Sequence, residues 1–156
     1  MNNKCEDFAN LEDLDIDLGK LGKASVLPDF TEYETYLDLN ERILYLDFDI
    51  NDALVDYSRR IIRWNRQDRD IPVEERKPIK LLINSYGGSL DSCLHFIDTL
   101  LLSKTPVYTY NVGVAMSAGF YIMLAGSKRF AYPNAQFLIH SGSGGAAGTY
   151  EQSKSQ

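Results

Sequence analysis

The chain has 156 residues, 44% of them hydrophobic and 24% charged, and carries a formal net charge of −6 at neutral pH. This length and composition are typical of one globular domain with a substantial core, and no apolar stretch is long enough to cross a bilayer. Two cysteines, Cys5 and Cys93, are too few for a disulfide framework. We therefore expect a reducing compartment, which would be the cytoplasm or an organelle matrix or stroma. We also expect no membrane, metal or cofactor.

The first 32 residues differ in composition from the rest of the chain. Residues 1–20 contain six acids and only two lysines, and they show weak hydrophobic periodicity. We predict an acidic, extended or mobile arm over residues 1–32 and one folded domain over residues 33–156. The acidity therefore lies away from the serine- and glycine-rich motifs found downstream.

A strand is expected over residues 42–48, and Asn51 or Asp52 is suited to cap the helix that follows. The apolar residues of this helix share one face: Leu54, Tyr57, Ile61 and Trp64. Arginines occupy its polar side and continue into the charged loop 66–78: Arg59, Arg60, Arg63, Arg66 and Arg69. Acids are at least as numerous as bases over residues 41–79, so we interpret the arginines as a solvated face or a subunit contact and expect no nucleic-acid partner.

The remainder of the chain alternates strands and helices. The expected elements are strand 79–84, helix 89–103, strand 106–112, helix 116–126 and strand 135–140. This alternation predicts an α/β fold of parallel βαβ units, with a mainly parallel sheet flanked by helices. Such sheets bind ligands at the carboxyl ends of their strands. Gly87, Ser117 and His140 all lie at or just past expected strand ends.

Ser117 is the strongest candidate for a catalytic residue. It lies among small residues (Val112–Gly119) that let another backbone approach, between an expected strand and an apolar helix. A serine hydroxyl attacks only when a base takes its proton and donors stabilise the oxyanion, and a helix N-terminus supplies such donors. His140 is the better base, because His95 is expected to be structural or solvated. On its helix, His95 lies opposite the face that is expected to pack, which is formed by Leu90, Leu94, Ile97 and Leu101.

Blander interpretations of these residues exist. Small residues around a serine often serve tight helix packing, and a histidine that ends a strand is often structural. The upstream pair Gly87-Gly88 favours a site, because glycines between a strand and a helix permit positive φ and let amides point at a ligand. An α/β-hydrolase is a poor fit, since its triad acid lies between serine and histidine and no Asp or Glu separates Ser117 from His140.

Several linked motifs together resemble one family. In chain order they are Asn84–Leu90, Asp98-Thr99, Val112–Gly119, Lys128–Asn134, Ile139-His140 and Gly144-Gly145. Their order and spacing resemble those of the proteolytic subunit of the Clp protease over residues 33–156. The resemblance implies a ClpP/crotonase-like fold with repeated β-β-α and βαβ units. It also implies a serine endopeptidase with no cofactor or metal of its own.

The resemblance assigns a role to each candidate residue. It makes Ser117 the nucleophile and His140 the general base, and the amides of Gly87 and Ala118 form the oxyanion hole. The segments 88–90 and 143–146 would pair with the substrate backbone as added strands. The implied substrate-binding residues are Gly88, Ser89, Leu90, Ser143, Gly144 and Gly145.

The same resemblance implies partners. Clp proteolytic subunits form homo-oligomeric rings, heptameric and stacked face to face. The rings enclose the sites and receive unfolded polypeptide from an ATP-driven AAA+ Clp unfoldase. This sequence has no phosphate-binding loop, so any ATP dependence would come from that partner.

The sequence also departs from the family pattern. Tyr86 replaces a usual proline, and Ser141-Gly142 replaces a usual glutamine-proline pair. The family's triad aspartate and most of its handle helix lie beyond Gln156, so the sequence is expected to be truncated and weakly active or inactive. Glu151 is the only acid after His140 and is not assigned the triad role.

Two alternative functions are considered, and the departures motivate the first of them. The first is a catalytically inactive or truncated ring subunit. The second is an acyl-CoA enzyme of the related crotonase architecture, in which paired amides polarise a thioester carbonyl. That chemistry usually needs a carboxylate near the amides, where this chain has Ser117, so the second alternative is remote.

Overall fold

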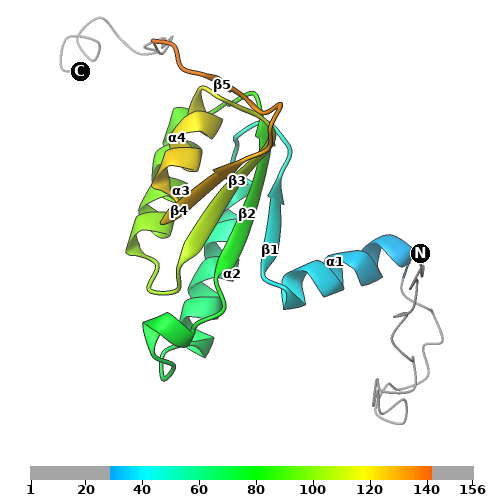
Figure 1. Ribbon diagram of the computed structural model, residues 1–156, viewed down its shortest axis with the longest axis vertical. Coiled ribbons are helices and arrows are strands. Elements are labelled where there is room, and N and C mark those ends of the chain that lie inside the picture. Colours follow the sequence, from blue (N-terminus) through cyan, green and yellow to red (C-terminus); the bar gives the residue numbers. More distant parts are fainter. Residues whose placement is uncertain (1–28, 142–156) are drawn as a thin grey trace, which may run out of the picture.

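The computed structural model describes residues 29–141, which are built around a five-stranded sheet (Figure 1). The strands are β1 (Ile43–Leu46), β2 (Ile79–Ser85), β3 (Val107–Met116), β4 (Lys128–Ala131) and β5 (Gln136–Leu138). Their order is β1-β2-β3-β4, with β5 paired to the last part of β3, and every pair is parallel. The predicted α/β fold with a mainly parallel sheet is therefore confirmed.

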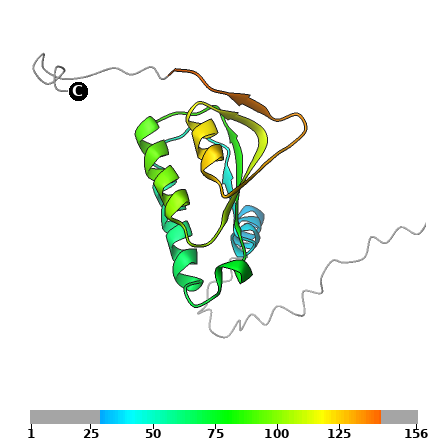
Figure 2. The same cartoon turned by 60° about the vertical axis from the view of Figure 1, so that its left-hand side comes forward.

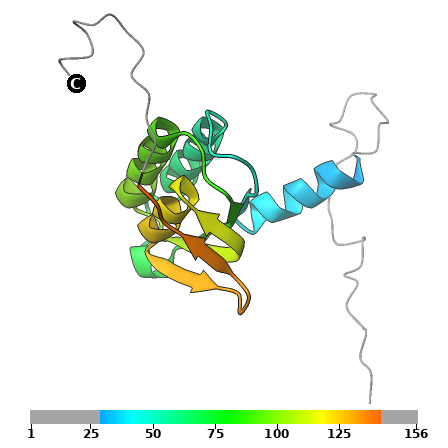
Figure 3. The same ribbon diagram turned by 90° about the horizontal axis from the view of Figure 1, so that it is seen from above.

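The helices are α1 (Phe30–Asn40), α2 (Leu54–Gln67), α3 (Leu90–Leu102) and α4 (Ala118–Ala125), with a short 3-10 helix, η2 (Val73–Glu75). Helices α2, α3 and α4 cover one face of the sheet (Figures 2 and 3). Alternate residues of β2 are fully buried: Ile79, Leu81 and Ile83. Phe96 of α3 and Ile122 of α4 are also fully buried, so the core lies between the sheet and these helices. Within residues 29–141 no helix combines the length and the apolar character needed to cross a bilayer.

Helix α1 projects from the sheet near the start of β1 (Figure 1) and has no buried residue. The sequence predicts an arm through residue 32, but the helix already begins at Phe30. Leu39 packs partly buried against the core, but a helix without a fully buried stripe leaves little amphipathic pattern in the sequence, which explains the difference. Residues 1–28 of the predicted arm lie outside the described residues.

Helix α2 begins close to the predicted cap. Asn51 Oδ1 accepts a hydrogen bond from Ala53 N (2.8 Å), which satisfies one backbone donor before the helix starts. The predicted apolar face of α2 meets the core: Leu54, Ile61 and Trp64 are buried and Tyr57 is half-buried. The Tyr57 hydroxyl donates to Tyr45 O (2.7 Å), so this face also ties α2 to β1.

Helix α3 is capped by Ser89, whose side chain accepts a hydrogen bond from Ser92 N. Its buried residues are Cys93, Phe96 and Leu100. Other apolar residues of the predicted packed face are exposed: Leu90, Leu94 and Leu101. Fewer apolar residues of α3 are buried than the sequence predicts. The helix carries leucines on several sides, and periodicity alone does not show which of these leucines face the core. His95 is exposed, as predicted.

A part-buried ion pair ties the start of β1 to the end of α2. Arg42 donates from both guanidinium nitrogens to the Asp68 carboxylate, at 2.6 Å each, and the Thr105 hydroxyl donates to the same carboxylate (2.7 Å). The hydrogen bond from Arg42 holds the pKa of Asp68 below its ordinary value. This network fastens α2 and the start of β3 to the end of the sheet opposite Ser117.

Candidate active site

The carboxyl ends of three parallel strands meet at one end of the sheet, and each leads to a predicted catalytic residue. Ser117 directly follows β3, Gly87 lies two residues beyond β2, and His140 lies two residues beyond β5. Parallel strands end at the same edge of their sheet, so the topology collects these segments as the sequence predicts. The detailed geometry then determines which of the side chains meet.

Ser117 has a backbone conformation that residues with a side chain rarely adopt. Its φ is +50° and its ψ is −122°. Such a conformation costs about 1–3 kcal/mol and persists only where the surroundings fix it. The Ser117 C=O accepts hydrogen bonds from Phe120 N (3.0 Å) and Tyr121 N (3.3 Å), and the Ser117 N–H donates to Leu138 O (2.9 Å). The start of α4 and strand β5 therefore hold Ser117 in a sharp turn at the end of the sheet.

Gly87 lies directly against Ser117. A Cβ atom placed on Gly87 would come within 2.7 Å of Ser117 Cβ and 2.9 Å of Met116 O. Gly87 also has φ +112°, which favours glycine. The turn after β2 thus needs a residue without a side chain, and the structure brings Gly87 and Ser117 into contact.

The two expected oxyanion-hole donors differ in their present state. Gly87 N–H donates to Ser85 Oγ (3.2 Å), and the buried Ser85 hydroxyl donates in turn to Phe48 O (2.7 Å). Ala118 N–H belongs to the first turn of α4, where amides lack intrahelical acceptors. It donates to no acceptor among residues 29–141. Within the described part of the chain, the Ala118 donor is therefore open and the Gly87 donor is engaged by Ser85.

His140 is exposed, and its Nδ1 lies 2.8 Å from Ser141 O. Its segment runs beside Ser117, because β5 pairs Met116 with Leu138 and Leu138 O accepts the Ser117 N–H. Among the hydrogen bonds of residues 29–141, none joins the imidazole to the Ser117 hydroxyl. The structure thus brings the two segments together without the hydrogen bond that a histidine base and a serine nucleophile would share.

The segment expected to bind substrate also contacts the chain that continues from β1. Ile50 N donates to Gly87 O and Ser89 N donates to Ile50 O, both at 2.8 Å, in a parallel bridge between Ile50 and Gly88. Backbone groups of an extended segment point alternately to its two edges, so the N–H and C=O of Gly88 face away from Ile50. Leu90 begins α3. Ser143, Gly144 and Gly145 lie outside the described residues.

Two polar residues near the site have roles that sequence patterns do not reveal. Ser85 holds the Gly87 amide, and Asn84 Oδ1 accepts a hydrogen bond from Val114 N (3.2 Å). Asn84 spans an irregularity in the β2–β3 pairing between Ile83 and Ser85. Both residues belong to the motif Asn84–Leu90, but their partners become visible only when β2 and β3 are paired in register.

Cys93 packs beneath the start of α4. It is fully buried, and its thiol donates to Ala118 O (3.3 Å). Burial raises the pKa of the Cys93 thiol to about 11, so the thiol is neutral at physiological pH and is a poor nucleophile. Within the described residues, no three His, Cys, Asp or Glu side chains are grouped as a metal site.

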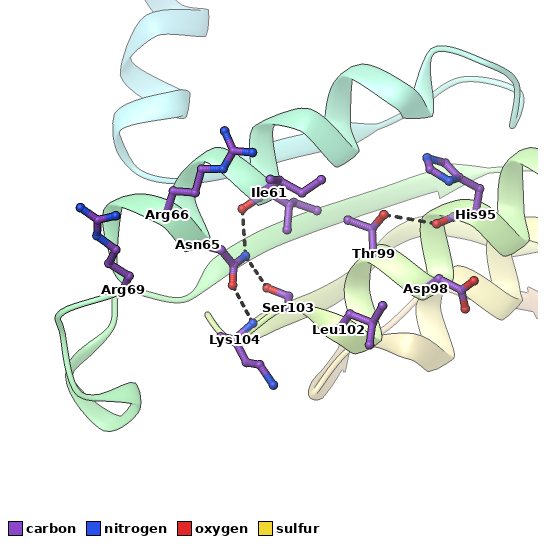
Figure 4. A pocket seen from close by; sticks show the side chains of 11 residues that line it. Ile61, Asn65, Arg66, Arg69, His95, Asp98, Thr99, Leu102, Ser103 and Lys104 are labelled. Atoms are coloured by element: carbon purple, nitrogen blue, oxygen red, sulfur yellow. Dashed lines mark hydrogen bonds between the residues drawn. The ribbon is translucent and has the colours of Figure 1, made fainter.

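A groove of about 560 Å³ lies between α2 and α3 (Figure 4). Asn65 links the two helices across it, because its Nδ2 donates to Ser103 Oγ (2.9 Å) and its Oδ1 accepts from Lys104 N (2.6 Å). Ile62 and Leu102 line it with exposed apolar surface, and Arg66 and Arg69 line it with charge. None of the predicted catalytic or substrate-binding residues that the structure describes lines this groove.

Comparison with known proteins identifies the class to which this fold and site belong. A model of the Clp protease family matches residues 32–156. The chain belongs to the Clp protease family.

Similar proteins of known name support the assignment. The chain is 34% identical to the ATP-dependent Clp protease proteolytic subunit 1 of Mycobacterium tuberculosis, over 71% of this chain and 54% of that protein. It is 36% identical, with the same coverage, to the proteolytic subunit 2 of Mycolicibacterium paratuberculosis. A ClpP1 mutant from Listeria monocytogenes matches in structure with a TM-score of 0.61 and 27% identity, over 71% of this chain and 63% of that one. The chain thus spans about half the length of the curated relatives it matches.

Proposed function

We propose that this protein is the serine endopeptidase subunit of an ATP-dependent Clp complex, which hydrolyses unfolded proteins to peptides. The observation that carries the proposal is the strained backbone of Ser117, held between Gly87 and the strand that leads to His140. Strain at a residue with a side chain concentrates where function needs that side chain. Membership of the Clp protease family supplies the reaction class.

In the proposed mechanism His140 takes the proton of the Ser117 hydroxyl as its oxygen attacks the carbonyl carbon of a peptide bond. The amides of Gly87 and Ala118 stabilise the tetrahedral oxyanion, and the N-terminus of α4 adds its positive dipole end. His140 then protonates the leaving amine as the C–N bond breaks. Water hydrolyses the acyl-enzyme and returns the hydroxyl to Ser117.

This mechanism requires two local rearrangements. The imidazole of His140 turns from Ser141 O toward the Ser117 hydroxyl, and the Gly87 N–H leaves Ser85 Oγ for the oxyanion. Both groups lie in connections beyond strand ends rather than within the sheet. Catalytic hydrogen bonds often tighten only when substrate is bound, so such changes are compatible with the chemistry.

Substrate would bind as an added strand. The outward-facing N–H and C=O of Gly88 offer backbone hydrogen bonds at one edge, and Ser89 and Leu90 complete that segment. Ser143, Gly144 and Gly145 would pair with the other side of the substrate backbone. Backbone pairing of this kind recognises extended polypeptide with little regard for sequence, which suits an unfolded protein.

We further propose homo-oligomeric assembly into stacked heptameric rings served by an AAA+ Clp unfoldase. The apolar surface that α3 leaves uncovered supports this: Leu94 is 52% exposed and Leu101 is 64% exposed. The groove between α2 and α3 (Figure 4) adds further exposed apolar side chains, Ile62 and Leu102. Exposed apolar patches are typical of protein–protein interfaces. The neutral, buried Cys93 thiol is compatible with a reducing compartment, the cytoplasm or an organelle matrix or stroma.

A second candidate function is a catalytically inactive ring subunit. Two observations favour it: among the hydrogen bonds of residues 29–141, none joins the His140 imidazole to the Ser117 hydroxyl, and the Gly87 N–H donates to Ser85 Oγ. In this alternative the rearrangements described above do not occur, and the subunit contributes only surface to the ring.

Labelling with a fluorophosphonate probe separates the two candidates. An active subunit labels in the full chain, loses all labelling with Ser117→Ala, and loses most of it with His140→Ala. Ser127→Ala is the matched control, because Ser127 lies just after α4 and its hydroxyl donates to Val107 O (2.8 Å) away from Ser117. Equal labelling of wild type and Ser117→Ala refutes the peptidase assignment, and a wild type that does not label supports the inactive subunit.

A further inference from the structure

Strand β3 changes its neighbour partway along its length. Its residues 108–111 pair with β4, and its residues 114–116 pair with β5. Residues 112 and 113 of β3 separate the two pairings, whereas the longer segment 132–135 connects β4 to β5. The connection therefore bows out of the sheet, and some interaction must fix where the chain enters β5.

Asn111 lies at the point of change and is fully buried. Its Nδ2 donates to Gln136 O (2.8 Å), its Oδ1 accepts from Gly113 N (3.1 Å), and its backbone O accepts from Tyr132 N (2.9 Å). A buried amide needs such partners. One residue thus holds the chain where it leaves β4, at Tyr132, and where it enters β5, at Gln136.

Strand β5 has little else to fix its register. Its three residues are all exposed, so burial in the core does not select one alignment over another. Its aromatic residue Phe137 packs edge-on against Phe120, with ring centroids 6.0 Å apart. Gln136 is the first residue of the strand, and its C=O accepts the hydrogen bond from the fully buried side chain of Asn111.

The register of β5 determines the geometry at Ser117. Leu138 pairs with Met116 and accepts the Ser117 N–H, and His140 follows two residues later. A slip by one residue would turn every side chain of β5 to the opposite face and displace His140 along the chain.

We propose that Asn111 is a positioning residue, which fixes the register of β5 on β3 and thereby places His140 within reach of the Ser117 hydroxyl. The catalytic consequence rests on the proposed peptidase function, whereas the effect on register does not. Asn111 contacts neither Ser117 nor His140 in the hydrogen bonds of residues 29–141, and its proposed effect on them is transmitted by the position of β5.

The test compares Asn111→Ala with Thr109→Val in the full chain. Thr109 is the matched control, because it is also fully buried in β3 but its hydroxyl donates to Met123 O (2.8 Å) in α4. Asn111→Ala should slow fluorophosphonate labelling of Ser117 by about 10- to 100-fold. The rate of labelling in Asn111→Ala should also lose the same pH dependence that is lost in His140→Ala. Thr109→Val should leave both close to wild type.

Hydrogen exchange of the Ser117 amide gives a second readout that needs no activity. This amide donates to Leu138 O, so it should exchange faster in Asn111→Ala than in Thr109→Val. If Asn111→Ala does not fold, Asn111→Asp replaces it, because the aspartate keeps the acceptor for Gly113 N–H and loses the donor to Gln136 O.

The outcomes distinguish this inference from the proposed function. Wild-type labelling and wild-type exchange in the Asn111 variants would overturn the inference, as would an equal loss in Thr109→Val. If wild-type Ser117 does not label, the peptidase proposal fails, and the exchange of the Ser117 amide alone decides whether Asn111 sets the register.

Discussion

Replacing Gly87 with alanine should disturb both folding and reactivity, because the new methyl group has no space. It would approach Ser117 Cβ at 2.7 Å and Met116 O at 2.9 Å, both close to the backbone of the β3–α4 turn. The φ of +112° adds strain of about 1–3 kcal/mol for a residue with a side chain. Overpacking against fixed atoms adds about 1–3 kcal/mol. We expect the free energy of unfolding to fall by about 2–6 kcal/mol in total.

The measurement is urea unfolding of Gly87→Ala, combined with the rate at which a fluorophosphonate labels Ser117. Gly113→Ala is the matched control, because the three atoms nearest to its added methyl group all belong to the side chain of Asn84 and Gly113 does not have positive φ. Its expected cost is about 0.5–1.5 kcal/mol, from the lost hydrogen bond between Asn84 and Val114 N. A Gly113→Ala protein as unstable as Gly87→Ala, or a Gly87→Ala protein as stable as wild type, would refute this reasoning.

Three further predictions concern pH, thiol reactivity and assembly. The pKa of Asp68 lies below its ordinary value of 3.8, so the ionised carboxylate stabilises the fold fully above pH 3.8, and this stabilisation is lost as the pH falls further. The free energy of unfolding in urea, measured at a series of acidic pH values, should therefore depend less on pH for Asp68→Asn than for wild type. Cys93, with its pKa of about 11, should react with a thiol reagent at about pH 8 only after denaturation, and fast native labelling would contradict its burial. Leu101→Glu should abolish oligomers in light scattering without unfolding the subunit, since Leu101 is already exposed.

Two of these predictions have close controls. Asp70→Asn should retain the wild-type pH dependence, because Asp70 is exposed and its ion pair with Arg69 lies in solvent. Val73→Glu changes another exposed apolar residue, in η2 rather than α3, and should leave assembly intact. Loss of oligomers in both charge variants would show that surface charge, rather than the α3 face, controls association.

The core elements of the fold could be predicted because burial imposes a regular period on the sequence. In β2 the buried residues alternate, and in α2 they recur on one face, so the hydrophobic pattern alone reveals both elements. Strand β4 and helix α1 bury no residue and leave no such pattern. Strand β3 extends beyond its predicted end through residues 113–116, which lead to Ser117. Gly113 looks like a strand end in the sequence, but Asn84 supports the strand there.

The candidate site could be predicted as a set of segments but not as a set of contacts. Topology brings the residues after β2, β3 and β5 together, which is why Gly87 and Ser117 touch. The orientation of His140 and the hydrogen bond from Gly87 N–H to Ser85 depend on side-chain rotation and local backbone geometry, on which sequence periodicity carries no information. The role of Asn111 could not be predicted for a related reason: a polar residue in an apolar strand has a partner only once the neighbouring strands are in place.

Because Ser117 has positive φ, the residue that would give the most stable backbone at this position differs from the residue that carries the hydroxyl. Glycine would occupy the same backbone conformation at ease, yet it would carry no hydroxyl. A programme of protein engineering that ranks substitutions by folding free energy alone would therefore choose to replace Ser117 early, and would gain stability by removing the hydroxyl that the proposed function requires.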